Sequence, residues 1–323
     1  MSLRKTLIVS LALSIVTPSL SDGAQQPPKI PRIGILGISS TDDPLDEAYR
    51  QTLREVGSVV GQPISVEWRW AEGRAERLPA LAADLVRLKV DAIMAFGDPS
   101  IRALQQATAT IPLVVASDDL VGERLVASLA RPGGNTTGFS ILATELNVKR
   151  LELLKEVVPK VSRVAVLWDP ETGRFHLGPL EVAARSLGLT LQVLEVRAPD
   201  DFAGAFEAAK KGHAAALNVL ASPFLNAYRN RIVGLAAKNR LPAIYQWRES
   251  VEAGGLVSYG PTLLEMYRRL AVLLDKVLKG AKPADLPMEQ PTRFELASNM
   301  KTAKALGLTL PQSILIRADQ MIQ

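Results

Sequence analysis

The sequence predicts an α/β protein made of two doubly wound lobes, each built on a parallel sheet. Strand and helix patterns alternate along the chain, and the pattern restarts after about 130 residues. The chain has 323 residues, enough for two hydrophobic cores at roughly 100–200 residues per domain. Hydrophobic residues make up 47% of the chain and charged residues 22%, which is typical of a folded globular protein.

The first segment has the layout of a secretory signal peptide. Arg4 and Lys5 precede an apolar run that is too short to span a bilayer comfortably, and Pro18 and small residues follow it. We therefore expect residues 1–21 to be removed on export to the periplasm, and the proline-containing segment 22–31 to be a linker. An uncleaved anchor or a buried N-terminal helix is the alternative.

The elements of the first lobe follow in order. Strand patterns occur at 32–38, 64–70, 90–96 and 113–116, and helix patterns occur at 46–56 and 78–88. The second helix carries one apolar stripe, formed by Leu78, Leu81, Ala82, Leu85 and Leu88. The run at 90–96 is apolar except for Asp91, as expected of a central parallel strand that is covered on both faces.

The second lobe repeats this order. Its first strand, RVAVLW at 163–168, resembles RIGILG at 32–37, and further strands are expected at 190–196, 214–220 and 242–245. Two segments match more closely. Phe96-Gly97-Asp98-Pro99 corresponds to Leu220-Ala221-Ser222-Pro223, and the stretch 111–140 corresponds to 241–260. We interpret the match as two similarly folded lobes, with coincidental similarity of two α/β halves as the alternative.

One long helix does not fit a simple succession of two lobes. Leu263, Tyr267, Leu270, Leu274 and Val277 form an apolar stripe, followed by a proline-broken segment and a last strand pattern at 293–297. This helix must pack on something, and a return to the first lobe is the expected solution. The lobes would then be joined by several parallel hinge segments.

The catalytic inventory is poor. The chain has no cysteine, which excludes disulfides, a thiol nucleophile and a cysteine-ligated metal. Neither of its two histidines, His176 and His213, has a ligand partner at helical spacing, so both are expected to be solvated. The sequence has no P-loop, no G-x-G-x-x-G and no G-x-S-x-G. We predict no catalysis, cofactor or metal, and the interspersed charges, with a formal net charge of +5, predict no nucleic-acid partner.

A ligand of an open parallel sheet binds beyond the carboxyl ends of the strands, so the turns at those ends supply the candidate site. Asp98 and Ser222 each precede a proline that is expected to begin a helix, which would aim free N–H groups at the site. Asp118 is a candidate partner for a ligand ammonium group. For Asp98, Ser222 and Asp118, the alternative to ligand binding is ordinary helix capping. For the aromatic candidates Trp168, Tyr245 and Tyr259, the alternative is packing at the interface between the lobes. The predicted ligand-binding residues are Ser39, Ser40, Gly97, Asp98, Ser100, Ser117, Asp118, Trp168, Ser222, Tyr245, Gln246 and Tyr259.

From about residue 32 to its C-terminus, the chain resembles the ABC-transporter substrate-binding protein family of bacteria, which has the type 1 periplasmic-binding-protein fold. The resemblance rests on extended segments such as EWRWAEGRAERLPALAADLVRLKVDAI, LVASLARPGGNTTGFS, KRLELLKEVVP, LPAIYQWRESVEAGGLVSYGP, LLDKVLKGAKPADLPMEQPTRFEL and KTAKALGLTLP. It departs from the family where members often have an Asp-Pro pair in place of Ser117-Asp118-Asp119, and where an acidic residue is expected in place of Ala221-Ser222. The loop at 39–45 is also its own version.

The resemblance implies two hinged α/β lobes joined by three crossovers, near Ser140, near Gly260 and within 287–292. The first lobe would comprise 32–140 plus 261–287, and the second 141–260 plus 288–323.

The implied function is that of the periplasmic solute-binding component of an ABC importer. As a monomer, it would capture a small molecule, such as an amino acid or another small carboxylate, perhaps aromatic, and deliver it to a membrane permease driven by a cytoplasmic ATPase. The alternative is a periplasmic sensor that presents its closed form to a membrane receptor or sensor kinase. A cytoplasmic repressor of the same fold is disfavoured, because no DNA-binding helix-turn-helix precedes Arg32.

Overall fold

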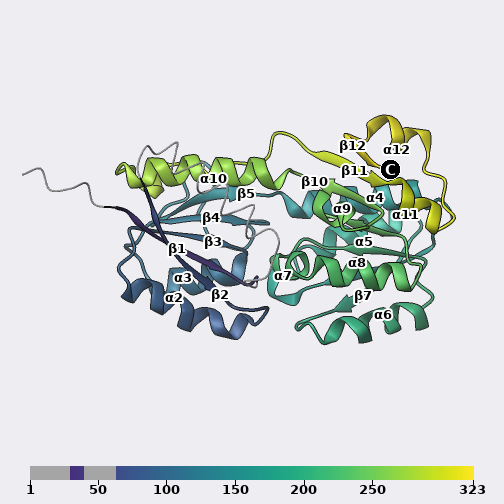
Figure 1. The fold of residues 1–323 in the computed structure, drawn as a ribbon, viewed down its shortest axis with the longest axis horizontal. Helices are drawn as coiled ribbons and strands as arrows, with labels where there is room; N and C mark the ends of the chain where they lie inside the picture. The colour runs from purple at the N-terminus through teal and green to yellow at the C-terminus, as the bar shows by residue number, and fades with distance from the viewer. Residues whose placement is uncertain (1–29, 40–62) are drawn as a thin grey trace, which may run out of the picture.

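The structure of the protein, a computed structural model, describes residues 30–39 and 63–323. It has two α/β lobes side by side, each with its own sheet (Figure 1). This confirms the predicted fold class. The expected signal peptide, most of the expected linker and the helix expected at 46–56 lie outside the described residues.

The first lobe holds a five-stranded parallel sheet in the order β2-β1-β3-β4-β5. Because Ile33 and Ile35 face one side of β1 and Leu36 faces the other, the sheet is buried on both faces. Helices α2 and α3 cover one face, and α10 runs over the other (Figure 1). The elements are β1 Arg32–Gly37, β2 Ser65–Trp70, η1 Ala75–Arg77, α2 Leu78–Arg87, β3 Ala92–Phe96, α3 Asp98–Ala107, β4 Leu113–Ser117, β5 Thr136–Ser140, α10 Leu263–Leu278 and η3 Pro283–Asp285.

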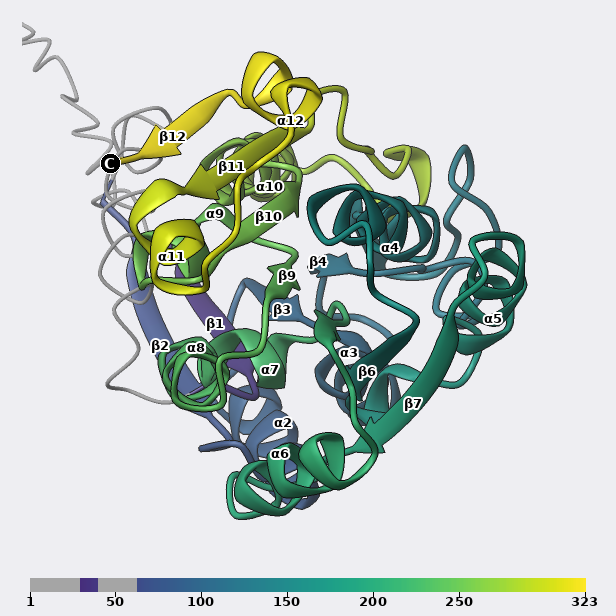
Figure 2. The ribbon, with the colours of Figure 1, turned by 90° about the vertical axis from the view of Figure 1, so that its right-hand side faces the viewer.

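The second lobe holds a seven-stranded sheet in the order β12-β11-β10-β9-β8-β6-β7. Helices α4 and α5 lie on one side of it and α6 and α8 on the other (Figure 2). The sheet is parallel except between β10 and β11. The elements are α4 Ala143–Val157, β6 Arg163–Trp168, η2 Pro170–Thr172, α5 Leu177–Ser186, β7 Thr190–Glu195, α6 Asp201–Lys211, β8 Ala216–Val219, α7 Pro223–Ala227, α8 Arg229–Lys238, β9 Ala243–Tyr245, α9 Arg248–Glu252, β10 Val257–Gly260, β11 Glu295–Asn299, α11 Met300–Ala305, α12 Gln312–Arg317 and β12 Gln320–Ile322.

The two sheets share one strand order. Read from its β7 edge, the second sheet runs β7-β6-β8-β9-β10, which repeats β2-β1-β3-β4-β5 of the first. The turn from β3 to α3 therefore occupies the same position in its lobe as the turn from β8 to α7. This is the correspondence that the two proline-containing segments predict from the sequence.

The chain passes between the sheets three times. It leaves the first sheet after β5, returns to it from β10 through α10, and leaves again after η3 for β11. The expected return of the 263–277 helix is confirmed, since α10 contacts β3, β4 and β5. The third passage runs beside the first. The backbone amide of Glu289 donates to the Gly138 carbonyl at 2.8 Å, and the backbone carbonyl of Glu289 accepts from the Ser140 amide at 2.8 Å.

Among residues 30–39 and 63–323, no helix is both long and apolar enough to cross a membrane.

Candidate ligand-binding site

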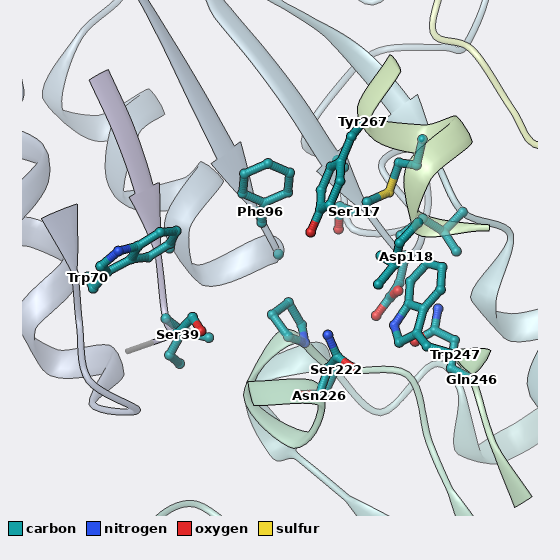
Figure 3. A pocket seen from close by; sticks show the side chains of 18 residues that line it. Ser39, Trp70, Phe96, Ser117, Asp118, Ser222, Asn226, Gln246, Trp247 and Tyr267 are labelled. Atoms are coloured by element: carbon teal, nitrogen blue, oxygen red, sulfur yellow. The ribbon is translucent and has the colours of Figure 1, made fainter. Parts of the chain in front are cut away.

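A cavity lies between the lobes, at the carboxyl ends of the strands of both sheets (Figure 3). About 800 Å³ of empty space lies among its lining residues, open solvent at the mouth included. The lining residues are Gly37, Ile38, Ser39, Trp70, Phe96, Gly97, Ala116, Ser117, Asp118, Ile141, Ser222, Pro223, Asn226, Gln246, Trp247, Leu263, Met266 and Tyr267.

Aromatic rings make up much of the wall. Phe96 ends β3, and Tyr267 reaches the cavity from α10; their ring centroids lie 5.8 Å apart in an edge-to-face arrangement. Trp70 ends β2 and lies against Gly37, where a Cβ would collide with the indole ring. Glycine at this position thus leaves room for the indole beside the cavity. Rings placed in this way offer a large contact area to an apolar or aromatic ligand group.

Asp118 is the only charged residue among the described residues that line the cavity. It follows β4, and its side chain points into the space beside Tyr267 and Asn226 (Figure 3). Its exposed fraction is 5%. Burial raises the pKa of Asp118 to about 7. The positive charge of Arg150 lowers this pKa, and the negative charge of Asp169 raises it further. The cavity therefore offers one carboxylate that is poised to accept a cation.

Behind Asp118 lies a second buried carboxyl group. Ser117 donates a hydrogen bond to Asp98, while Asp98 Oδ2 and the Ser100 hydroxyl have no hydrogen-bond partner among the residues described. Burial, followed by repulsion from Asp118, raises the pKa of Asp98 well above its usual range. The alternative reading from the sequence, in which Asp98 caps helix α3, is wrong. Gly97 holds the N-cap position with φ 81°, and the Asp98 side chain turns to Ser117 instead.

Ser222 behaves as the sequence predicts. Its hydroxyl accepts from the Leu225 amide at 3.1 Å, which caps α7, and donates to Asp169 Oδ2 at 2.7 Å. Burial raises the pKa of Asp169 to about 6, against the lowering effect of the Ser222 hydrogen bond.

Two amide side chains of the second lobe that line the cavity carry buried polar atoms without a hydrogen-bond partner among the described residues. Gln246 Nε2 and Asn226 Oδ1 are buried and have no hydrogen-bond partner within the described part of the chain. Both residues line the cavity. An unsatisfied buried polar group is costly, so a ligand that supplied the missing partners would gain affinity.

Half of the twelve predicted residues line the cavity: Ser39, Gly97, Ser117, Asp118, Ser222 and Gln246. Asp98 and Ser100 are buried behind it, and Ser40 lies outside the described residues.

The three aromatic candidates are not brought to the cavity. Trp168 donates its indole N–H to the Gly173 carbonyl at 3.1 Å, within the second lobe. Tyr245 is 2% exposed in a hydrophobic core, and the Tyr259 ring lies 6.0 Å from that of Phe294. Twelve lining residues were not predicted from the sequence, and among them are the aromatic residues Trp70, Phe96, Trp247 and Tyr267 and the amide Asn226.

The two histidines differ. His213 is exposed, as expected. The expectation of a solvated His176 is wrong, because its ring is fully buried and Nδ1 lies 3.0 Å from the Thr144 hydroxyl. Burial, followed by repulsion from Arg150, lowers the pKa of His176 to about 3, so the ring is neutral. Over the described ranges, no group of three or more potential ligand residues is placed to hold a metal ion.

The lobes meet at three glycines with positive φ. A Cβ on Gly97 would lie 2.5 Å from Pro223 Cγ, one on Gly73 2.8 Å from the Tyr228 hydroxyl, and one on Gly173 2.5 Å from Glu123 Oε1. Each contact joins the first lobe to the second. The structure therefore shows the lobes closed on each other, and at Gly97 a side chain would collide with the ring of Pro223.

Comparison with known proteins gives one family and several relatives. Residues 38–322 match the family model described as ABC transporter substrate binding protein. A tyrosine-binding protein of Clostridioides difficile (strain R20291) is 25% identical over 270 residues, which is 82% of this chain and 77% of that protein.

Two solved structures are also similar. A conserved domain protein from Vibrio cholerae O1 biovar eltor has a TM-score of 0.83 at 25% identity, over 91% of this chain and 100% of that one. An ABC domain from Streptococcus pneumonia in complex with L-Trp has a TM-score of 0.79 at 25% identity. The match covers 90% of this chain and 100% of that one.

Proposed function

Because the chain belongs to the ABC transporter substrate-binding protein family, we propose that it captures an aromatic α-amino acid in the cleft between its lobes. The observation that carries this proposal is a single buried carboxylate facing an otherwise uncharged cavity with aromatic walls. Relatives in this family bind substrates, and the proposal assigns no reaction to the site.

The charge of the cavity favours a ligand with an ammonium group. Asp118 can pair with that group, and closure of the lobes would strengthen the pair by excluding water. No lysine or arginine side chain is among the described lining residues, so an anionic ligand without an amine would meet Asp118 unpaired. The ligand carboxylate would instead be held by neutral donors, of which the unpartnered Gln246 amide is one.

The walls favour an aromatic side chain. Phe96, Tyr267 and Trp70 come from three separate elements of the first lobe and offer ring faces and edges to the ligand. The names of two relatives support the same class, since one is a tyrosine-binding protein and the other is a complex with L-Trp.

The remaining parts of the role follow from the family. We infer export to the periplasm through the N-terminal signal sequence, capture by the monomer, and delivery to the permease of an ABC importer. We also retain the lobe boundaries proposed from the sequence. The sensor role would use the same cleft, and none of the described residues favours it.

A thermal-shift panel tests the proposal. We expect L-Trp, L-Tyr or L-Phe to raise the melting temperature, because a ligand that binds only the folded state stabilises it by RT ln(1 + [L]/Kd). At 100 times Kd this is about 2.7 kcal/mol, which corresponds to a shift of roughly 5 °C for a chain of this size.

The matched controls are 3-phenylpropionate, which lacks the amine, and L-glutamate, which lacks the ring. Neither should shift the melting temperature at the same concentration. A shift with 3-phenylpropionate equal to that with L-Phe would contradict the role of Asp118. No shift with any aromatic amino acid would overturn the proposed ligand class.

A further inference from the structure

Arg150 is a fully buried cation that does not line the cavity. It lies on α4 in the second lobe, with 0% exposure. Its Nη1 donates to the Tyr259 carbonyl at 2.9 Å and its Nη2 donates to Asn147, while Nε has no hydrogen-bond partner among residues 30–39 and 63–323. A buried charge that is only partly satisfied is costly, so its position calls for an explanation.

Helix α4 connects Arg150 to Asp118. The backbone carbonyl of Asp118 accepts from the amide of Ala143, the first residue of α4, at 3.3 Å. Asp118 therefore lies at the positive end of the helix that carries Arg150, and both features favour the charged carboxylate. No ion pair within 4.0 Å joins the two side chains in the described structure, so the positive charge of Arg150 acts on Asp118 from a greater distance.

The other charged groups near Asp118 are all acidic. Asp169 faces it from the second lobe, Asp119 is its neighbour in the chain, and Asp98 lies behind it after β3. Of the groups whose charges act on Asp118, Arg150 is the only cation. Arg150 itself is faced by the neutral His176 and by Tyr259. Without Arg150, the carboxyl group of Asp118 would be buried among other acids.

We propose that Arg150 is a positioning residue that favours the charged form of Asp118 in the closed cleft and thereby sets the pH range over which a ligand ammonium group binds. This inference rests on the proposed function, because it assumes that Asp118 pairs with the ligand amine.

The pH dependence follows from the two pKa values. Burial raises the pKa of Asp118 to about 7, and the positive charge of Arg150 limits this rise. Burial lowers the pKa of Arg150 to about 9, and the negative charge of Asp118 limits this fall. Near pH 7, then, Arg150 is charged and Asp118 is half ionised. Because the charged carboxylate binds the ammonium group, affinity should fall about tenfold per pH unit below the pKa of Asp118 and level off above it.

The test is the pH profile of Kd for an aromatic amino acid, measured by calorimetry between pH 5 and pH 8.5. Arg150→Met should raise the midpoint of the profile by at least one pH unit and weaken binding at pH 7 about tenfold. Arg150→Lys keeps the charge and should keep the midpoint near 7. Arg185→Met removes the same charge from an exposed position on α5 and should leave the profile unchanged.

A merely structural role for Arg150 would give a different result. It would weaken binding by the same factor at every pH, and the midpoint would not move, which would overturn the inference. If Arg150→Met does not fold, Arg150→Gln carries the same test, because its amide can still donate to the Tyr259 carbonyl. Failure of the wild-type protein to bind any aromatic amino acid would instead refute the proposed function, so the two failures are distinguishable.

Discussion

The Gly97→Ala variant is expected to bind its ligand roughly 10- to 100-fold more weakly than the wild-type protein. A Cβ on residue 97 would lie 2.5 Å from Pro223 Cγ, a distance at which one of the two must move. Gly97 belongs to the first lobe and Pro223 to the second, so the collision arises only when the lobes close. Overpacking of this kind costs roughly 1–3 kcal/mol, which corresponds to the stated range of Kd.

Gly133→Ala is the matched control. Gly133 has φ 78°, close to the 81° of Gly97, but a Cβ there would have no neighbour within 4 Å. Both variants place an alanine at a positive φ, so the melting temperatures of both without ligand should fall. Calorimetry should show weakened binding for Gly97→Ala alone, and small-angle scattering should show less compaction with ligand. Equal affinities of the two variants would contradict the closure contact.

Asp118→Asn is expected to weaken binding of an aromatic amino acid roughly 100-fold at pH 8, because the ligand ammonium group loses its charged partner in a buried site. Binding of 3-phenylpropionate should improve, since its carboxylate would no longer meet a negative charge. The ratio of the affinity for the aromatic amino acid to that for 3-phenylpropionate, measured by competition, reports the change in amine recognition. Small changes in folding affect both affinities and cancel in this ratio. An unchanged ratio would show that Asp118 does not recognise the amine.

The same substitution should not destabilise the ligand-free protein. The pKa of Asp118 is raised to about 7 in the folded state from 3.8, so its contribution to stability is greatest below pH 4 and is lost as pH rises through 7. Up to about 1.4 kcal/mol is lost per pH unit in this window. We expect Asp118→Asn to unfold at a higher denaturant concentration than the wild type at pH 8. Asp119→Asn is the control, since Asp119 is not among the lining residues and accepts from the Gly122 amide at 2.8 Å.

The fold was accessible from the sequence because its signals are local. Continuous apolar runs such as that of β3 identify buried parallel strands, and the repeated proline-containing turns identify equivalent positions in two lobes. The ends of short strands were less well placed. The strand expected at 214–220 is β8 Ala216–Val219, and that expected at 293–297 is β11 Glu295–Asn299.

The site was accessible only in part. Residues directly after a strand, such as Ser117 and Asp118, reach the cavity because the strand ends point there. Side-chain direction decides the aromatic residues, and the sequence does not show it. Trp168 ends β6 but turns to the Gly173 carbonyl, whereas Trp70 ends β2 and reaches the cavity past a glycine. Tyr267 comes from a helix whose packing on the first lobe depends on the whole topology.

The closed lobes explain why these residues act together. Pro223, Asn226 and Gln246 belong to the second lobe, and Phe96 and Asp118 belong to the first. Neither lobe alone encloses the cavity. A ligand that contacts both lobes favours the closed state by the difference between its affinities for the closed and open forms.

A crystal structure of the protein with L-Trp or L-Tyr tests the central claim most directly. The expected result is a closed protein with the ligand between the lobes, its ammonium group within hydrogen-bond distance of Asp118 and its ring against Phe96 and Tyr267. A ligand bound to one lobe only, or one whose carboxylate rather than its amine faces Asp118, would contradict the account.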